Sequence, residues 1–196
     1  KSKGAQGEGF EQIENFIKSN IAESNHNIKS DLFLKALELR ESGKFKQAID
    51  ILESEIDNVL GNAENHALLS HCYILNEELE KANNQLDKAR EIDPNIAEIG
   101  WNYSRILLKR KNKVDALKVA RETNKLFPDD IEGMGVMGSC LWANGKISES
   151  LKFLNNAIEL NPNYAEALIT RGLIWLSKEE KLKALSDLEE AFRIKP

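Results

Sequence analysis

The side chains that most often carry out chemistry are few in this sequence, and their spacing keeps them apart. His66 and His71 are five residues apart on one predicted helix, so they point to different faces. No third ligand follows nearby, which argues against a zinc site. Cys72 directly follows His71, but adjacent helical residues point about 100° apart, so we expect no Cys–His nucleophile pair.

The two cysteines are not expected to form a disulfide. Cys72 and Cys140 take equivalent places in the repeat described below, on helices two units apart, which puts them on the order of 20 Å from each other. A disulfide needs Cα atoms within about 7 Å. We interpret both as buried thiols used in packing. The two cysteines do not decide whether the protein resides in an oxidising or a reducing compartment. A cytoplasmic location is favoured.

Phosphate-binding and acid–base motifs are also absent from the sequence. Gly133-Met134-Gly135 stands at the start of a predicted helix without the rest of a phosphate-binding loop. Glu179 and Glu180 fall in a predicted turn and are expected to be solvated. The sequence therefore predicts no catalytic residue, no metal ligand and no cofactor, and we do not expect an enzyme.

The strongest pattern in the chain is a repeat. The four prolines, Pro94, Pro128, Pro162 and Pro196, follow one another at intervals of 34 residues. The same interval aligns two columns of small residues: Ala48, Ala82, Ala116, Ser150 and Ala184, and Ala36, Ser70, Ser104, Gly138 and Gly172. Small residues at one place in every unit mark where two helices approach closely, because a larger side chain would hold their axes apart.

Each unit has the pattern of two helices joined by a turn. Apolar residues between the columns recur at helical spacing, as in Leu151, Leu154 and Ile158. A short polar break such as Ala143-Asn144-Gly145-Lys146 interrupts each unit near its middle, and a proline closes it. No segment alternates in the manner of a strand. The sequence therefore predicts an all-α solenoid.

This pattern resembles the tetratricopeptide repeat (TPR) family, whose helix–turn–helix units of 34 residues stack into a right-handed superhelical solenoid. The resemblance implies a TPR domain at 29–196, with about five repeats at 29–62, 63–96, 97–130, 131–164 and 165–196. It departs from the family at the usual tryptophan position, which holds Leu32, His66, Gly100, Met134 and Leu168.

The two ends of the chain lie outside this pattern. Residues 1–28 are expected to be a flexible N-terminus with a short amphipathic helix, marked by Phe10, Ile13, Phe16, Ile17 and Ile21. We interpret this helix as a cap over the first repeat, with a displaced or partner-binding helix as the alternative. The sequence stops at Pro196 without a polar cap, so we expect either a longer natural protein or stacking of the last repeat on another copy.

The resemblance also implies where a partner would bind, because the first helix of each TPR unit lines a concave groove. The family's groove positions are occupied here by Ser30, Phe33, Leu34, Leu37, Arg40 and Glu41; by Glu64, Ala67, Leu68, His71, Ile74 and Leu75; by Glu98, Trp101, Asn102, Arg105, Leu108 and Lys109; by Glu132, Gly135, Val136, Ser139, Trp142 and Ala143; and by Glu166, Ile169, Thr170, Leu173, Leu176 and Ser177. This set is apolar for a solvent-facing surface, and exposed apolar patches commonly mark interaction sites.

The middle of this groove holds most of the candidate binding residues. Trp101, Arg105 and Lys109 are spaced to form one stripe on a helix. An aromatic anchor beside an arginine is typical of a binding hot spot, and it would suit a peptide that offers an apolar side chain and an acidic group. The candidates are Arg40, His71, Trp101, Asn102, Arg105, Lys109 and Trp142. The alternative for Trp101 is that it is the family's packing tryptophan, displaced by one residue from Gly100.

The best-known ligand mode of the family, a carboxylate clamp for chaperone tails, does not match this sequence. Asn102 fits the middle slot of the clamp, but Ala67, His71, Glu132 and Val136 occupy flanking slots that need other residues. Binding of chaperone tails is therefore not expected.

Composition narrows the classes of partner. The 196-residue chain is 41% hydrophobic and 30% charged, with a net charge of −5, and its pI near 5.4 argues against nucleic acid. No apolar run approaches the roughly 20 residues of a membrane span, so membrane insertion is not expected. Only the unit 97–130 is basic, with eight basic and five acidic side chains, and this excess would suit an acidic partner.

Taken together, these patterns predict a non-catalytic scaffold that binds a protein or peptide segment in a concave groove. One alternative is the substrate- or partner-recruiting region of a larger enzyme, a transferase or an oxygenase, because TPR arrays resembling this one occur fused to such enzymes. Another is a self-assembly module, in which the last repeat stacks on a second copy.

Overall fold

The computed structural model of the protein describes residues 31–58 and 62–195, and the regular elements in these ranges are all α-helices. In chain order they are α2 (Asp31–Glu41), α3 (Phe45–Asn58), α4 (Ala63–Leu75), α5 (Leu79–Ile92), α6 (Ala97–Lys109), α7 (Lys113–Leu126), α8 (Ile131–Ala143), α9 (Ile147–Leu160), α10 (Ala165–Ser177) and α11 (Lys181–Ile194). The predicted all-α solenoid is confirmed. The amphipathic helix expected within 1–28 lies outside the described residues. Within them, no helix is both long and apolar enough to span a bilayer.

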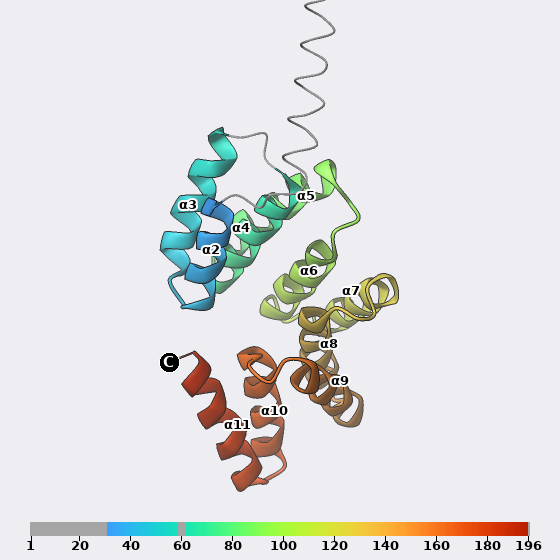
Figure 1. Cartoon of the computed structure of the whole chain (residues 1–196). Coiled ribbons are helices and arrows are strands. Elements are labelled where there is room, and N and C mark those ends of the chain that lie inside the picture. The colour runs from blue at the N-terminus through green and yellow to red at the C-terminus, as the bar shows by residue number, and fades with distance from the viewer. Residues whose placement is uncertain (1–30, 59–61, 196) are drawn as a thin grey trace, which may run out of the picture.

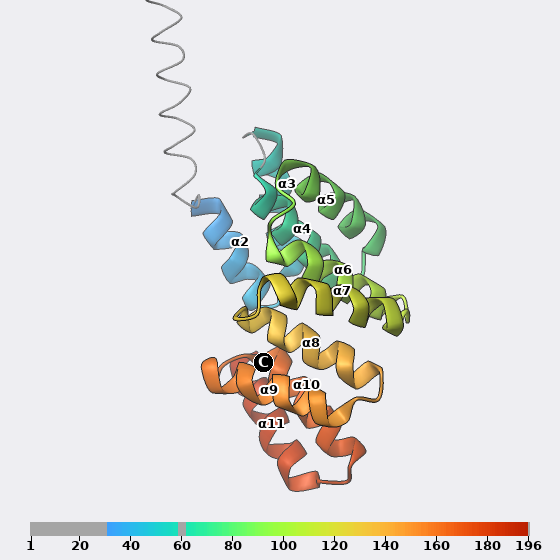
Figure 2. The ribbon, with the colours of Figure 1, turned by 90° about the vertical axis from the view of Figure 1, so that its right-hand side faces the viewer.

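The helices alternate between an inner and an outer position. The inner helices α2, α4, α6, α8 and α10 each contact the next inner helix, and every outer helix up to α9 contacts the inner helix of its own unit and of the next. The result is a curved stack, which Figure 1 shows from the side on which its two ends approach each other. Figure 2 shows the same helices as successive layers, from α3 to α11. The inner helices thus form the concave side.

Two columns of small residues let the helices of each unit pack closely, as the sequence pattern predicted. Ala48, Ala82, Ala116, Ser150 and Ala184 are all fully buried. At the facing column, a Cβ on Gly138 would lie 2.6 Å from Cδ2 of Leu154, closer than real contacts allow. A Cβ on Gly172 would meet Leu188 in the same way, at 2.9 Å. The crossing point of each helix pair therefore accepts small residues only.

The turn between the two helices of each unit contains one residue in the left-handed backbone region. This residue recurs at the repeat interval, at Gly43, Glu77, Lys111, Gly145 and Glu179, with φ between 61° and 75°. Residues with a Cβ are strained in this region, whereas glycine adopts it freely. The turn therefore favours glycine but tolerates a long polar residue.

We predict that Gly145→Ala lowers the free energy of unfolding by about 1 kcal/mol, because the added Cβ is strained at a φ of 75°. A Cβ there would meet no atom within 4 Å, so the effect isolates backbone strain from packing. Lys111→Ala is the matched control, because it changes the side chain at an equivalent turn without adding a Cβ. Urea denaturation measures both, and an equal loss in the two variants would contradict this account.

Candidate peptide-binding groove

The concave side contains a hollow of about 650 Å³ between four inner helices, α4, α6, α8 and α10. Its lining is His71, Ile74, Leu75, Arg105, Leu108, Lys109, Gly135, Val136, Ser139, Glu166, Ile169, Thr170 and Leu173. All of these belong to the groove positions that the family resemblance implies. Apolar side chains from different helices face this space, and Leu173 remains 38% exposed. The hollow therefore has a lining that is largely apolar and partly exposed to solvent.

Arg105 supplies the main charge at this hollow. Its Nη1 donates a hydrogen bond to Oδ1 of Asn102 at 3.0 Å. Its Nη2 lies 3.7 Å from Oε1 of Glu132 and 3.5 Å from Oε2 of Glu166, and it makes no hydrogen bond. Burial disfavours the charged form, but attraction to both carboxylates outweighs it, so the pKa of Arg105 is raised. The guanidinium is charged, and its outer nitrogen is incompletely satisfied.

His71 is buried beside this arginine and is neutral. Burial is the main cause that holds the pKa of His71 well below its usual range, and the positive charges of Arg105, Arg40 and Lys195 add to it. Nδ1 of His71 therefore accepts a hydrogen bond from Nη1 of Arg40 at 3.0 Å, which leaves the proton on Nε2. That Nε2 has no hydrogen-bond partner. His71 thus keeps a second buried donor without a partner, and the 3.9 Å approach of Glu132 to His71 is not an ion pair.

Trp101 is not a groove residue, and its interpretation as an exposed aromatic anchor is wrong. Its side chain is 0% exposed and packs with Ala116 and Met137. Its Nε1 donates a hydrogen bond to Oδ2 of Asp130 at 2.7 Å. The ring lies over the start of α8, where a Cβ on Gly133 would come within 2.3 Å of Cζ2. The alternative interpretation, a packing tryptophan, is the one that the structure supports.

The other candidates divide between the hollow and the packing around it. Asn102 is buried and its Nδ2 donates to the carbonyl oxygen of Ala67 at 3.0 Å, so it holds α6 against α4. Trp142 is half-buried against Leu154 and Ile174 and does not line the hollow. Lys109 does line it. The structure therefore gathers His71, Arg105 and Lys109 at the hollow, with Arg40 beside them.

Three important groups in this region were not among the candidates. Glu132 and Glu166 lie in the first turns of α8 and α10, where carboxylates are favoured by the helix dipole. Tyr164 donates from its hydroxyl to the carbonyl oxygen of Glu132 at 3.2 Å, and its ring covers Gly135. The sequence did carry a signal, because glutamate recurs at the repeat interval in Glu64, Glu98, Glu132 and Glu166.

The two cysteines are buried and reduced, as free thiols. Burial raises the pKa of Cys72 to about 11 and that of Cys140 to about 12. Thiols with such pKa values are weak nucleophiles near neutral pH. Among the described residues, no group of three or more histidines, cysteines or carboxylates is arranged to hold a metal ion.

Helix–turn–helix units stacked around one concave surface define the class of α-solenoid repeat proteins, which bury each unit against its neighbours. A family model described as tetratricopeptide repeat matches residues 131–164, which hold α8 and α9. The repeat interval, the small-residue columns and the fold agree with this match, and together they support a tetratricopeptide repeat family for the chain.

The chain is also similar to individual TPR proteins. Hsp70-Hsp90 organizing protein 1 of Glycine max is 28% identical over 119 residues, which cover 61% of this chain and 21% of that protein. A UDP-N-acetylglucosamine–peptide N-acetylglucosaminyltransferase of Giardia intestinalis is 28% identical over 96 residues, or 48% of this chain and 6% of the enzyme. The chain thus spans about a fifth or less of these relatives. The crystal structure of a tetratricopeptide repeat protein from Parabacteroides merdae shares the fold, with a TM-score of 0.68, 18% identity, and coverage of 96% of this chain and 74% of that one.

We predict that Trp101→Ala lowers the free energy of unfolding by about 3–5 kcal/mol, as truncation of a fully buried aromatic residue does. Trp142→Ala is the matched control and should lose less, because this tryptophan is only half-buried. Chemical denaturation followed by circular dichroism measures both. If Trp101→Ala unfolds at the same denaturant concentration as the parent protein, the packing interpretation is wrong and the side chain faces solvent in the groove.

Proposed function

We propose that the protein is a non-catalytic scaffold that binds a peptide segment of another protein in the concave groove. The observation that carries the proposal is the hollow of about 650 Å³, in which apolar side chains from α4, α6, α8 and α10 surround the charged Arg105. A site with an apolar floor and a few converging polar groups is the usual form of a binding pocket. The occupant is a segment with one apolar side chain for the floor.

The polar groups at the hollow favour an acidic group on the same segment. Nη2 of Arg105 has only distant contacts to Glu132 and Glu166, and a carboxylate in direct contact would satisfy it better. Nε2 of His71, which also lines this hollow, is a buried neutral donor without a partner. A ligand carboxylate competes with the two internal glutamates, so we expect the apolar contact to contribute most of the affinity.

The names of the relatives are consistent with the binding of proteins or peptides. The Glycine max protein is named an Hsp70-Hsp90 organizing protein, and the Giardia protein is named a peptide N-acetylglucosaminyltransferase. The groove of this chain lacks the side chains of the chaperone-tail clamp, so we propose a different peptide as its ligand. If the chain belongs to a larger transferase, the same groove would recruit that enzyme's protein substrate.

Selection from a random peptide library displayed on phage tests this function. The chain should enrich peptides that combine an apolar with an acidic residue. Leu173→Glu should weaken their binding on the order of tenfold or more, because a buried apolar contact contributes about 1.5–3 kcal/mol. Val114→Glu is the control on the outer helix α7, where the side chain is 66% exposed. Absence of enrichment, or equal binding by both variants, would refute the proposal.

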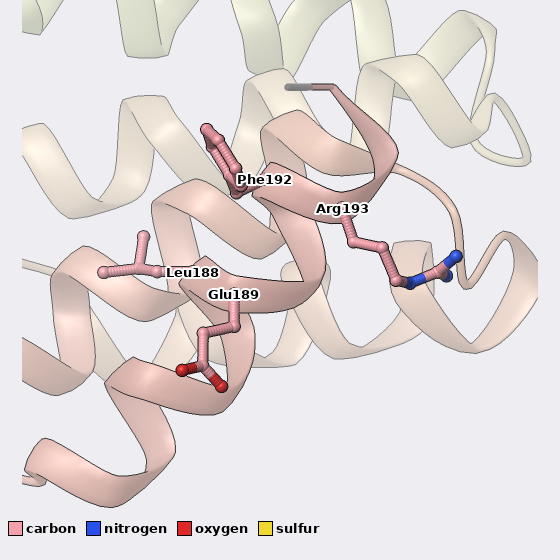
Figure 3. A pocket seen from close by; sticks show the side chains of 4 residues that line it. All are labelled: Leu188, Glu189, Phe192 and Arg193. Carbon is pink, nitrogen blue, oxygen red and sulfur yellow. The ribbon is translucent and has the colours of Figure 1, made fainter.

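A second candidate function, self-association, is favoured by the outer face of α11. On α9, Leu151 and Ile158 pack against the next inner helix, α10. The equivalent residues of α11, Leu185 and Phe192, are 53% and 69% exposed. Figure 3 shows Phe192 at a hollow on this face, with Leu188, Glu189 and Arg193. Within the described residues, this face has the apolar character of a unit interface and is exposed.

The charges of the chain favour a pair of α11 helices over head-to-tail stacking. The outer side of α2 carries Lys35 and Glu38, at repeat positions where α8 buries Met137 and Cys140. Stacking α2 of one copy on α11 of another would bury these charges at a high cost. Two antiparallel α11 helices instead bring Lys183 of one helix toward Glu190 of the other, which are opposite charges.

We predict that the protein forms a dimer as its concentration rises and that Leu185→Glu combined with Phe192→Glu keeps it monomeric. The reason is that each substitution places a charge in the apolar contact. Leu126→Glu, which changes an exposed leucine on α7, should dimerise as the parent does. Sedimentation velocity at several concentrations measures this. A parent chain that is monomeric throughout would eliminate self-association.

A further inference from the structure

The two ends of the described chain meet across the mouth of the groove. Lys195, which directly follows α11, places Nζ 2.8 Å from Oε2 of Glu41, the last residue of α2. Figure 1 shows the C-terminal end facing α2 across the open side of the curved stack. The first and last helix pairs are therefore in contact, although three other helix pairs separate them in the sequence.

This contact continues into the groove as a series of alternating charges. Glu41 is paired with Arg40, and Nη1 of Arg40 lies 3.5 Å from Oε1 of Glu132 on α8. Arg105 then joins Glu132 to Glu166 through its Nη2. The six side chains are called the ionic clasp: Lys195, Glu41, Arg40, Glu132, Arg105 and Glu166. Each contact within the clasp joins opposite charges, and together they link α2, α6, α8 and α10 to the end of α11.

Within the described residues, the helices of the first pair do not pack directly against those of the last pair. The helix α2 contacts only α3 and α4, and α11 contacts only α10. Neighbouring units, in contrast, share buried apolar side chains such as Leu154 and Ile174. The closure of the stack therefore depends on charged side chains rather than on a packed interface.

The outermost contact of this closure, between Glu41 and Lys195, is weak and sensitive to salt. The side chains of Glu41 and Lys195 are 48% and 34% exposed, and exposed ion pairs contribute little and are screened. Burial pushes the pKa of Glu41 upward, but the hydrogen bond from Lys195 and the charge of Arg40 outweigh it, and the pKa is lowered. The pair is fully charged at neutral pH. It can separate without unpacking any unit of the solenoid.

The clasp also divides the groove. Arg40, Glu41 and Lys195 line a second hollow of about 710 Å³, which has Leu37 and Leu75 in its wall. Arg105 lines the first hollow, and Glu166 lines both. A peptide that occupies the two hollows must therefore cross the line of the clasp.

We propose that the ionic clasp is a gate on the groove: closed, it separates the two hollows, and open, it lets one extended segment pass along both. The gate opens and closes without any ligand. Its control of peptide entry, in contrast, rests on the binding function proposed above. A segment rich in acidic residues is the ligand that opens the gate most readily, because it competes for Arg40 and Arg105.

The distance between α2 and α11 tests the clasp directly. Spin labels on Lys35→Cys and Glu189→Cys, two exposed positions, report this distance by pulsed electron spin resonance, while the native cysteines are buried. We expect one short distance at low salt and a longer, broader distribution at about 1 M salt, where the screening length is about 3 Å. Lys195→Glu should give the long distance at low salt.

A charge exchange makes the result specific. Glu41→Lys combined with Lys195→Glu should restore the short distance, because the pair is re-formed with the charges reversed. Lys181→Glu, the same charge change elsewhere on α11, should leave the distance unaltered. A distance that responds neither to salt nor to Lys195→Glu overturns the clasp.

The outcome is separable from the fate of the proposed function, because the distances are measured without ligand. A salt-dependent distance together with failed peptide selection would reject the groove as a peptide site and keep the clasp. Successful selection with a constant distance would reject the clasp alone. With both in place, Lys195→Gln, which breaks the contact without adding a negative charge that would repel an acidic peptide, should accelerate association of a selected peptide severalfold, as measured by stopped-flow fluorescence.

Discussion

The close approach of two helices at a column of small side chains is the constraint on which this structure depends. Ala48, Ala82, Ala116 and Ala184 are completely buried where the helices of each unit cross, and Ser150 takes the equivalent place in the fourth unit. Every larger residue there would push the helices apart and change the angle between successive units. Because the same contact recurs at a fixed interval, small rotations add up along the chain, and they produce the curved stack.

This curvature decides the electrostatics of the groove. Glutamates in the first turns of α8 and α10 stabilise their own helices, a local effect that each unit can provide alone. Only the curved stack brings Glu132 to Arg40 and Arg105, which belong to other units. The basic side chains of the groove are therefore partly neutralised before any ligand arrives, which distinguishes this groove from one built to attract acidic peptides by charge alone.

Trp101 illustrates how packing between units can override a surface pattern. Its spacing with Arg105 and Lys109 is that of an exposed stripe, and the helical pattern alone does not distinguish this from a core position. The decisive partners lie at the start of α8, where Gly133 leaves room for the ring and Asp130, the residue just before the helix, accepts its hydrogen bond. A search for small residues opposite large ones in adjacent units would have found this pairing in the sequence.

The sequence by itself determined the local architecture: the repeat interval, the helix–turn–helix unit and the small-residue crossings, while the family resemblance supplied most of the positions that face the concave side. These properties follow from contacts within a unit and between neighbouring units. A periodic sequence specifies the same contacts in every repeat. Only the tertiary structure decided which of those positions are free. Whether Asn102 is exposed, how Arg105 is paired and whether Glu41 meets Lys195 depend on the accumulated curvature of the whole stack, a sum of small rotations that no single repeat encodes.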